Sequence, residues 1–489
     1  MHEPSSVAEL VESLRRDLDR YSEGEKLPSS RALVERHRVS PVTVSRAIAA
    51  LVAEGLVVSR PGAGVFRAAA GAGPGGGPAR PHGDVSWQEV ALSSDAGARH
   101  VGAGAGGLLA TLTVPPPEVI DLNGGYPHAS LLPERTLAAA LARAGRRPGA
   151  WGRPPVDGLT ELRAWFARDI GGPGGALGAS DVLVTAGGQS ALTTALRSLV
   201  APGAPVLVES PTYPGILAVA RAAGLRPVPV PVDGDGVRTD LLAEAFAASG
   251  ARAFVCQPLF QNPTGAVLSA RRRGEVLRIA RAAGAFVVED DFARRLVHAD
   301  AGAVPRPLAA DDPDGVVVHV RSLTKAASPS LRVAALAARG PALERLRAVQ
   351  VVDSFFVPRP LQEAALELVG DPGWARHLRT LAAELHRRRE AAVRALRAGL
   401  PGLLGPTAPA GGYHLWLRLP DGRDEGAVTA AALRAGVGVT PGRSYFAAEA
   451  PAPHLRLSYA AAESTAQVAE GVERLRRAYR DSGDGVPAA

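Results

Sequence analysis

The sequence predicts a multidomain protein in which a small α+β unit precedes a large α/β domain that ends in a smaller α+β lobe. Three observations predict this division. Residues 5–67 carry three short helical patterns and a hairpin signal, and residues 68–83 are almost entirely alanine, glycine and proline. From about residue 118, strand patterns alternate with helical patterns. The length of 489 residues also exceeds what one hydrophobic core organises.

Composition excludes several classes of protein. Hydrophobic residues make up 46% of the chain, which indicates a globular protein rather than a disordered one. No uninterrupted apolar run approaches the roughly 20 residues that span a bilayer, and the N-terminus lacks the apolar stretch of a signal peptide. The only cysteine, Cys256, has no second cysteine to pair with. We therefore expect a cytoplasmic protein without a membrane partner.

The first 53 residues predict three helices. Apolar residues at helical spacing indicate a helix over residues 7–20, and serines 29 and 30 are candidate caps for a second helix that ends near residue 37. Ser40 followed by Pro41 is a strong start for a third helix, because serine favours the cap and proline the first helical position. The apolar face of this third helix consists of Val44, Ile48, Leu51 and Val52.

A hairpin signal follows, with residues 56–60 and 65–66 on either side of a Pro-Gly-Ala-Gly turn. Three helices and such a hairpin form a winged helix-turn-helix, whose third helix enters the major groove of DNA. Residues 31–67 contain six arginines against two glutamates, which suits a DNA phosphate backbone. The alternative is a helical domain for protein contact, with arginines that only solvate it. We expect DNA contacts from Arg31, Thr43, Ser45, Arg46, Arg60, Gly62 and Gly64.

Lysine is almost absent from this chain. Lys26 and Lys325 are its only lysines, although lysine and arginine together number 55. An amine can attack a carbonyl carbon, whereas a guanidinium with a pKa above about 12 cannot. The rarity of lysine draws attention to Lys325 as a chemical group, although two lysines could also survive a compositional bias by chance.

The large domain is predicted to hold a parallel sheet. The predicted strands cover residues 182–185, 206–209, 253–257, 286–290 and 316–320. Residues 370–480 mix amphipathic helices with strands at 412–419 and 455–459, as in a small α+β lobe. Polar residues follow several of these strands, where parallel sheets commonly bind ligands.

A pyridoxal phosphate site needs an amine, a carboxylate against the ring nitrogen, a donor to the ring phenolate, and binders for the phosphate. Lys325, Asp290 and Asn262 follow or end strands and supply the first three. Residues 186–190 join a strand to a helix and form a phosphate cradle, to which Arg332 adds a guanidinium. Each motif alone has an ordinary structural explanation, such as a β-turn or a surface lysine, but their order along one domain favours the cofactor.

Two resemblances strengthen these predictions. The segments KLPSSRAL, VSPVTVSRA, EGLV and RPGAGVF, within residues 5–67, resemble GntR-type regulators. The order of the cofactor motifs over residues 118–480 resembles fold-type I aminotransferases. The second resemblance implies that Tyr213 stacks on the ring, that Gly188, Gln189 and Ser322 bind the phosphate, and that Arg456 grips a substrate carboxylate.

Two positions depart from the aminotransferase pattern. Phe292 stands where the family usually has a tyrosine that donates to the phenolate, and Trp151 stands where a tyrosine usually reaches the partner subunit's phosphate. Both departures leave open whether any transaminase turnover remains. Neither removes the amine of Lys325.

The combination resembles the MocR subfamily of GntR-type regulators. It implies a homodimer that binds an operator in double-stranded DNA, with pyridoxal phosphate or a small amino compound as effector. We expect a DNA-binding domain over residues 1–69, a linker over 70–115, and an aminotransferase-like domain over 116–483. The rivals are a working aminotransferase with an appended DNA-binding domain, and a regulator whose large domain has lost the cofactor.

Overall fold

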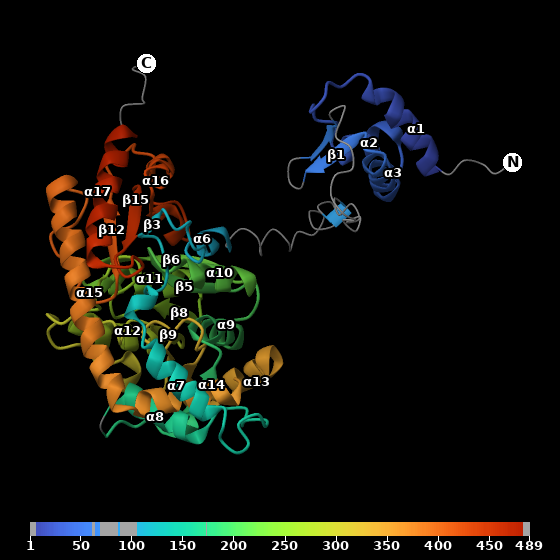
Figure 1. Ribbon diagram of the computed structural model, residues 1–489. Helices are drawn as coiled ribbons and strands as arrows, with labels where there is room; N and C mark the ends of the chain where they lie inside the picture. The colour runs from blue at the N-terminus through green and yellow to red at the C-terminus, as the bar shows by residue number, and fades with distance from the viewer. Residues whose placement is uncertain (1–5, 61–63, 69–86, 89–104, 173, 483–489) are drawn as a thin grey trace. The chain divides into compact units, whose positions relative to one another are not determined.

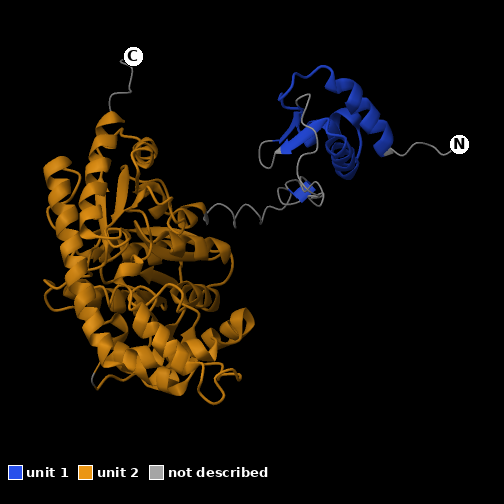
Figure 2. Ribbon diagram, in the orientation of Figure 1, with its two compact units in different colours: residues 1–100 blue, residues 101–489 orange. Residues whose placement is uncertain are grey.

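The computed structural model describes residues 6–60, 64–68, 87–88, 105–172 and 174–482. Two compact units make up the chain, residues 1–100 and residues 101–489 (Figure 2). No helix in the described ranges is long and apolar enough to cross a membrane.

The first unit is a winged helix-turn-helix, as the sequence predicts (Figure 1). Its third helix begins where expected, because the Ser40 hydroxyl accepts a hydrogen bond from the Thr43 amide at 3.1 Å. Leu14, Leu33 and Leu51 pack in its small core. The elements are α1 (Ser6–Leu18), α2 (Ser30–His37), α3 (Pro41–Ala53), β1 (Val57–Arg60) and β2 (Gly64–Arg67), with β1 and β2 antiparallel.

The second unit is built around an eight-stranded sheet in the order β4-β11-β10-β9-β8-β5-β6-β7. The five central strands β10, β9, β8, β5 and β6 are parallel. Only β11 and β7 run against their neighbours. The strands β6, β7 and β11 have no counterpart among those predicted from the sequence. The strands are β4 (Val182–Thr185), β5 (Pro205–Ser210), β6 (Arg226–Asp233), β7 (Gly236–Val237), β8 (Ala253–Cys256), β9 (Phe286–Asp291), β10 (Val317–Ser322) and β11 (Ala334–Ala337).

Helices cover both faces of this sheet, so alternate residues of each strand are buried in different cores. On β8, for example, Val255 belongs to the core beneath α9, α10 and α13, whereas Phe254 belongs to the larger core that contains α8, α11 and α12. This arrangement explains the near-continuous apolar strands. The helices are α7 (Glu134–Ala144), α8 (Thr160–Gly171), α9 (Gly188–Leu199), α10 (Pro214–Ala222), α11 (Thr239–Ser249), α12 (Ala270–Ala282), α13 (Pro341–Ser354) and α14 (Arg359–Gly370).

A smaller α+β lobe completes the second unit. Its three-stranded sheet has the order β12-β15-β14, and a separate short pair joins β13 to β3 near the start of the unit. The predicted strands at 412–419 and 455–459 are therefore present with slightly different ends. The elements are β3 (Ile120–Asp121), α15 (Pro372–Gly399), β12 (His414–Arg418), α16 (Glu425–Arg434), β13 (Val437–Gly438), β14 (Thr440–Pro441), β15 (His454–Ser458) and α17 (Thr465–Asp481).

The range predicted as a linker, residues 70–115, mostly lies outside the described residues. Its last part is described, and it contains a short helix, α6 (Ala105–Ala110). Composition gave no sign of this helix, because alanine and glycine dominate the segment. Packing holds the segment instead, since α6 contacts α10.

Candidate functional site

A cavity lies where the carboxyl ends of the parallel strands meet the small lobe. All nine residues expected to bind the cofactor or the substrate carboxylate line this one cavity. They come from the ends of β9 and β10, from the start of α9, from loops, and from β15. These residues are Gly188, Gln189, Tyr213, Asn262, Asp290, Ser322, Lys325, Arg332 and Arg456.

Lys325 lies three residues beyond the end of β10 and points into the cavity. Its Nζ donates a hydrogen bond to the Gly125 carbonyl oxygen at 2.5 Å and lies 3.7 Å from the centre of the Tyr126 ring. Burial lowers the pKa of this amine to about 7, the positive charges of Arg456 and Arg332 add to the effect, and Asp290 opposes it. A large share of the amine is therefore neutral and nucleophilic near neutral pH.

Asp290 is the penultimate residue of β9 and is buried against Gln257. The Gln257 Nε2 donates to the Asp290 Oδ2 at 2.6 Å. Burial raises the pKa of Asp290 to about 6, and the Gln257 hydrogen bond acts in the opposite direction. The carboxylate is thus held without an ion pair in the described structure, which is the state needed to receive a protonated ring nitrogen.

Gln257 was not among the residues predicted from the sequence. Besides the contact of its Nε2 with Asp290, the Gln257 Oε1 accepts from the Asn262 backbone amide at 3.0 Å, and the Gln257 backbone amide donates to the Glu209 carboxylate at 3.0 Å. It therefore fixes two expected cofactor ligands at once. The available signal was its position directly after the buried strand β8, in the loop that carries Asn262.

On the side of the cavity expected to bind the ring phenolate, the side-chain amide of Asn262 is present, and Phe292 stands where the family usually has a tyrosine. The Asn262 Oδ1 is buried and has no hydrogen-bond partner within the described part of the chain. Phe292 is 9% exposed and lines the same cavity, so the tyrosine hydroxyl usual in the family is missing here. An unpaired buried amide oxygen of this kind suits a donor on a bound molecule, whereas a phenolate oxygen would take its hydrogen bond from the Asn262 Nδ2 group.

The start of α9 and Arg332 form an anion-binding end. Gly187 has a φ of +92°, and a Cβ there would lie 2.5 Å from the Arg332 guanidinium, so a larger residue would displace that group. Arg332 donates to the Ala186 carbonyl oxygen at 2.8 Å. The amides of Gly188 and Gln189 open the helix. A helix N-terminus beside a guanidinium suits a phosphate.

Arg456 lies on β15 on the small-lobe side of the cavity. It is buried, and it donates hydrogen bonds to the Asn123 carbonyl oxygen and, at 3.3 Å, to the Thr440 hydroxyl. Its Nε has no partner in the described structure. A guanidinium with unused donors in a cavity is suited to a carboxylate.

Other lining residues were not anticipated from the sequence. The Tyr413 hydroxyl donates to the same Gly125 carbonyl oxygen that Lys325 contacts, at 2.7 Å. His414 is buried next to it, and burial followed by the charges of Arg456 and Lys325 holds its pKa well below the usual range. The glycine pair that precedes these residues, 411–412, was the only sequence signal.

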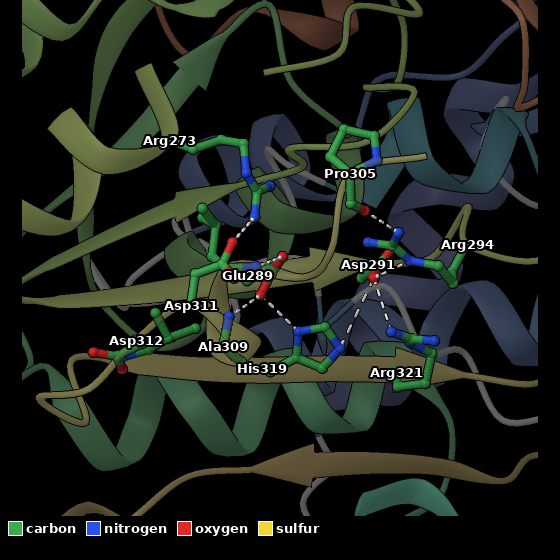
Figure 3. A network of polar contacts seen from close by, with 12 residues as sticks. Arg273, Glu289, Asp291, Arg294, Pro305, Ala309, Asp311, Asp312, His319 and Arg321 are labelled. Atoms are coloured by element: carbon green, nitrogen blue, oxygen red, sulfur yellow. Dashed lines mark hydrogen bonds and ion pairs between the residues drawn. The ribbon is translucent and has the colours of Figure 1, made fainter. Parts of the chain in front are cut away.

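A charged network supports the site from the other face of β9 (Figure 3). Asp291 is buried and pairs with Arg294 at 2.9 Å and Arg321 at 3.0 Å. Burial opposes its ionisation, but these arginines lower the pKa of Asp291. Asp291 follows the site residue Asp290 on β9, and Arg321 precedes the site residue Ser322 on β10. Their pairing therefore fixes the register of these two strands at the cavity.

The same network contains Glu289 and His319, which with Asp291 place three potential metal-ligand atoms within 4.8 Å of one another. Glu289 accepts from the His319 Nδ1 at 2.7 Å and from the amides of Leu308 and Ala309. Backbone amides and guanidinium groups therefore already satisfy most of these carboxylate oxygens. This arrangement favours an ion-pair network over a cation site.

The expected DNA-contacting residues lie on the first unit. Arg46 is exposed on α3, Thr43 and Ser45 are half-buried there, and Arg31 is exposed on α2 with Glu35 at 3.5 Å. Gly64 begins β2 with a φ of +111°. The Arg60 side chain and Gly62 lie outside the described part of the chain.

Two further residues could reach DNA. Val42 is 55% exposed on the first turn of α3, where a methyl group can contact thymine. Lys26 is exposed and lies beside the wing, since a Cβ on Gly64 would lie 2.7 Å from its Cε. In the sequence, Lys26 stood out as one of two lysines and as part of the KLPSSRAL segment, but it was not predicted to contact DNA.

The fold and the site define the class of protein. It combines a winged helix-turn-helix with a domain of the fold-type I aminotransferases, which bind pyridoxal phosphate. The family of aminotransferases of class I and II matches residues 117–475, and the gntR family of bacterial regulatory proteins matches residues 7–66. The chain therefore belongs to the class I and II aminotransferase family and carries a GntR DNA-binding domain, the combination found in MocR regulators. Its cofactor is pyridoxal 5′-phosphate.

Relatives of both kinds are similar to this chain. The 2-aminoadipate transaminase of Thermus thermophilus is 32% identical over 74% of the chain and 91% of its own length. The HTH-type transcriptional regulator TauR of Rhodobacter capsulatus is 29% identical over 94% of the chain and 93% of its own length. The crystal structure of LysN from Thermus thermophilus, an α-aminoadipate aminotransferase bound to N-(5′-phosphopyridoxyl)-L-leucine, superposes with a TM-score of 0.74 at 30% identity and covers 82% of the chain and 100% of LysN.

Proposed function

We propose that this protein controls transcription by binding operator DNA through paired winged helices, and that an amino compound bound with pyridoxal phosphate in the cavity alters this binding. The observation that carries the proposal is the convergence of Lys325, Asp290 and Arg456 in one cavity of a chain that also has a GntR domain. The domain limits in this proposal are residues 1–69, 70–115 and 116–483.

When bound, pyridoxal phosphate supplies an aldehyde carbon for covalent attachment and a ring that accepts electrons. Lys325 supplies the attaching amine, and Asp290 keeps a proton on the ring nitrogen. Gly188, Gln189, Ser322 and Arg332 hold the phosphate.

The remaining site residues orient the ring and the effector. Tyr213 would pack against the bound ring, and the Asn262 Nδ2 would donate to its phenolate oxygen. Arg456 would bind the carboxylate of an amino compound. Binding then shifts the population of conformations that the DNA-binding domains read.

A homodimer would place two winged helices on paired half-sites of an operator. Exposed apolar residues support this proposal: Trp151 is 82%, Val352 78% and Phe355 68% exposed. The loop that carries Trp151 adjoins α13, because Asp157 in that loop pairs with Arg347 at 2.7 Å. A soluble monomer rarely leaves so many large apolar side chains in water on neighbouring segments.

A footprint on DNA tests the proposal. The full-length protein is mixed with a duplex selected from a random library, with and without pyridoxal phosphate and a panel of amino acids and amines. We expect at least one amino compound to change affinity or footprint in the native protein, and no amino compound to do so in Lys325→Ala. Unchanged affinity and footprint under saturating ligand would contradict regulation by the cavity.

The second candidate function is catalysis. It is favoured by the similarity to a 2-aminoadipate transaminase and by the retained Lys325, Asp290 and Arg456. A working transaminase would convert its cofactor to the pyridoxamine form in a single turnover and release a keto acid. We expect this conversion to be slow, because Phe292 removes a hydroxyl next to the reacting groups. Fast release of stoichiometric keto acid would make the chain an enzyme as well.

A further inference from the structure

The first described segment of the second unit forms part of the cavity wall. This segment, residues 105–113, is called the strap here and consists of α6 followed by Thr111, Leu112 and Thr113. Thr111 and Leu112 line the cavity. The helix α6 packs on α10, one of the helices that cover the large sheet (Figure 1). Gly107 of α6 approaches the small lobe so closely that a Cβ added to it would lie 2.6 Å from the Ser444 Cβ. The strap therefore contacts both lobes, and along the chain it lies between them and the DNA-binding unit.

Hydrogen bonds tie the strap to the turn formed by residues 123–125. The Asn123 Nδ2 donates to the Ala110 carbonyl oxygen at 2.7 Å. The Gly125 amide donates to the Thr111 carbonyl oxygen at 3.1 Å. The Asn123 side-chain oxygen in turn accepts from the Thr440 hydroxyl of β14, which fixes the orientation of the amide.

The opposite side of the same turn holds the two cations expected to bind ligand. Lys325 donates to the Gly125 carbonyl oxygen, and Arg456 donates to the Asn123 carbonyl oxygen. Asn123 and Gly125 therefore each contact the strap, through the Asn123 side chain and the Gly125 backbone amide, and each contact a ligand-binding group through a carbonyl oxygen.

Ligand binding changes the hydrogen bonds of Arg456. A ligand carboxylate on Arg456 competes for the guanidinium N–H groups that now donate to the Asn123 carbonyl oxygen. The turn then loses or rearranges its bonds on the cavity side. Because Asn123 and Gly125 also hold the strap, that change reaches the strap through single hydrogen bonds.

We propose that Asn123 is a positioning residue that couples a ligand carboxylate on Arg456 to the strap, and that the side chain of the bound amino acid lies against Thr111 and Leu112. The inference rests on the proposed function. Among the described residues that line the cavity, Asp290 is the only acid, and Arg456 is the one cation not expected to hold the cofactor. The matching ligand is an α-amino acid with a single carboxylate and an uncharged side chain.

The test uses two stable probes that differ only in the carboxylate: N-(5′-phosphopyridoxyl)glycine and N-(5′-phosphopyridoxyl)methylamine. Each is bound to the full-length protein freed of cofactor, and calorimetry establishes saturation. Hydrogen–deuterium exchange is then followed in peptides that cover residues 105–117. We expect the exchange rate of the strap amides to differ between the two complexes by at least about fivefold, the lower range of typical allosteric coupling.

Three variants sharpen the test. Asn123→Ala removes the bonds to Ala110 and Thr440 but keeps the carbonyl on Arg456, so both probes should give the same strap exchange. Thr113→Ala is the matched control, because it removes a bond inside the strap, to Leu109, and should keep the difference. If Asn123→Ala does not fold, Thr440→Ala replaces it and should reduce the difference.

The outcomes separate the two proposals. Equal strap exchange with both probes bound to the native protein would overturn the inference and leave the proposed function standing. A difference that persists in Asn123→Ala would show that another route carries it, which also overturns the role of Asn123. Failure of both probes to bind would remove the cofactor site itself, and the inference with it.

Discussion

At the residue scale, burial gives two groups of the cavity unusual proton affinities. The pKa of Lys325 is lowered to about 7 and that of Asp290 is raised to about 6, with burial the largest cause for each. Removing water penalises the charged form of both groups, so the amine loses a proton more easily and the carboxyl keeps one more easily. A bound cofactor relieves both penalties, because it takes up the amine and pairs with the carboxylate.

The shifted pKa of Lys325 predicts how cofactor attachment depends on pH. Only the neutral amine attacks, so the rate should rise about tenfold from pH 6 to pH 8 and then level off, whereas an ordinary lysine with a pKa of about 10.4 would gain about a hundredfold without levelling. Stopped-flow absorbance of the lysine-bound cofactor checks this, with Lys325→Ala as the blank. A rate that still climbs between pH 9 and pH 10 would contradict the lowered pKa.

Replacing Gln257 should weaken cofactor binding without altering the amine of Lys325. Gln257→Leu removes the donor to Asp290, which raises the pKa of that carboxyl further and weakens its pairing with the ring nitrogen. We expect the Kd for pyridoxal phosphate to rise about ten- to a hundredfold, the range for a hydrogen bond to a charged group. Fluorescence titration measures it. Gln350→Leu, another buried glutamine outside the cavity lining, should lower the Tm but leave this Kd unchanged.

At the element scale, helix N-termini do much of the positioning. The start of α9 faces the anion-binding end of the cavity, and the start of α3 is fixed by its Ser40 cap and Pro41. Each terminus leaves backbone amides unused within the helix. The start of α9 therefore presents donors to the cavity, whereas at the start of α3 the Ser40 hydroxyl already accepts from the Thr43 amide and Pro41 has no N–H.

Replacing Arg46 on α3 and replacing Arg31 on α2 should affect DNA binding in different ways. Arg46→Ala on α3 should cost about 1–3 kcal/mol on a selected duplex and little on scrambled DNA, as expected for a base contact. Arg31→Ala on α2 should weaken both duplexes alike and reduce the slope of log K against log salt by about one. Fluorescence anisotropy over a salt series measures both. Equal behaviour of the two variants on both duplexes would contradict this division of roles.

At the scale of the whole molecule, the exposed aromatic side chains predict self-association. Trp151→Ala should raise the dimer dissociation constant at least about thirtyfold, because buried tryptophans are frequent hot spots of about 2 kcal/mol or more. Sedimentation velocity over a concentration series provides the measurement. Trp87→Ala, an exposed tryptophan of the first unit, serves as the control and should leave association unchanged. A native protein that stays monomeric at micromolar concentration would refute the homodimer.

The sequence by itself predicted most of the elements and the residues that line the cavity. Periodicity, caps and apolar strands predicted the three helices, the wing and most strands of the sheet. Lysine scarcity and polar residues at strand ends singled out Lys325, Asp290 and Asn262. These signals are local, because a cap or a strand end depends on neighbours a few residues away.

Only the tertiary structure decided the contacts between distant segments. Gln257 meets Asp290 33 residues later, and Asn123 meets Arg456 333 residues later. The strand β11 joins the sheet between β4 and β10, and α6 forms in a segment of small residues that packing alone holds. Pairing of this kind depends on the three-dimensional path of the chain, and no short-range pattern encodes it. The physical reason is that a hydrogen bond across the sheet or between lobes depends on where the folded backbone brings two groups, whereas a helix cap depends on residues a few positions away.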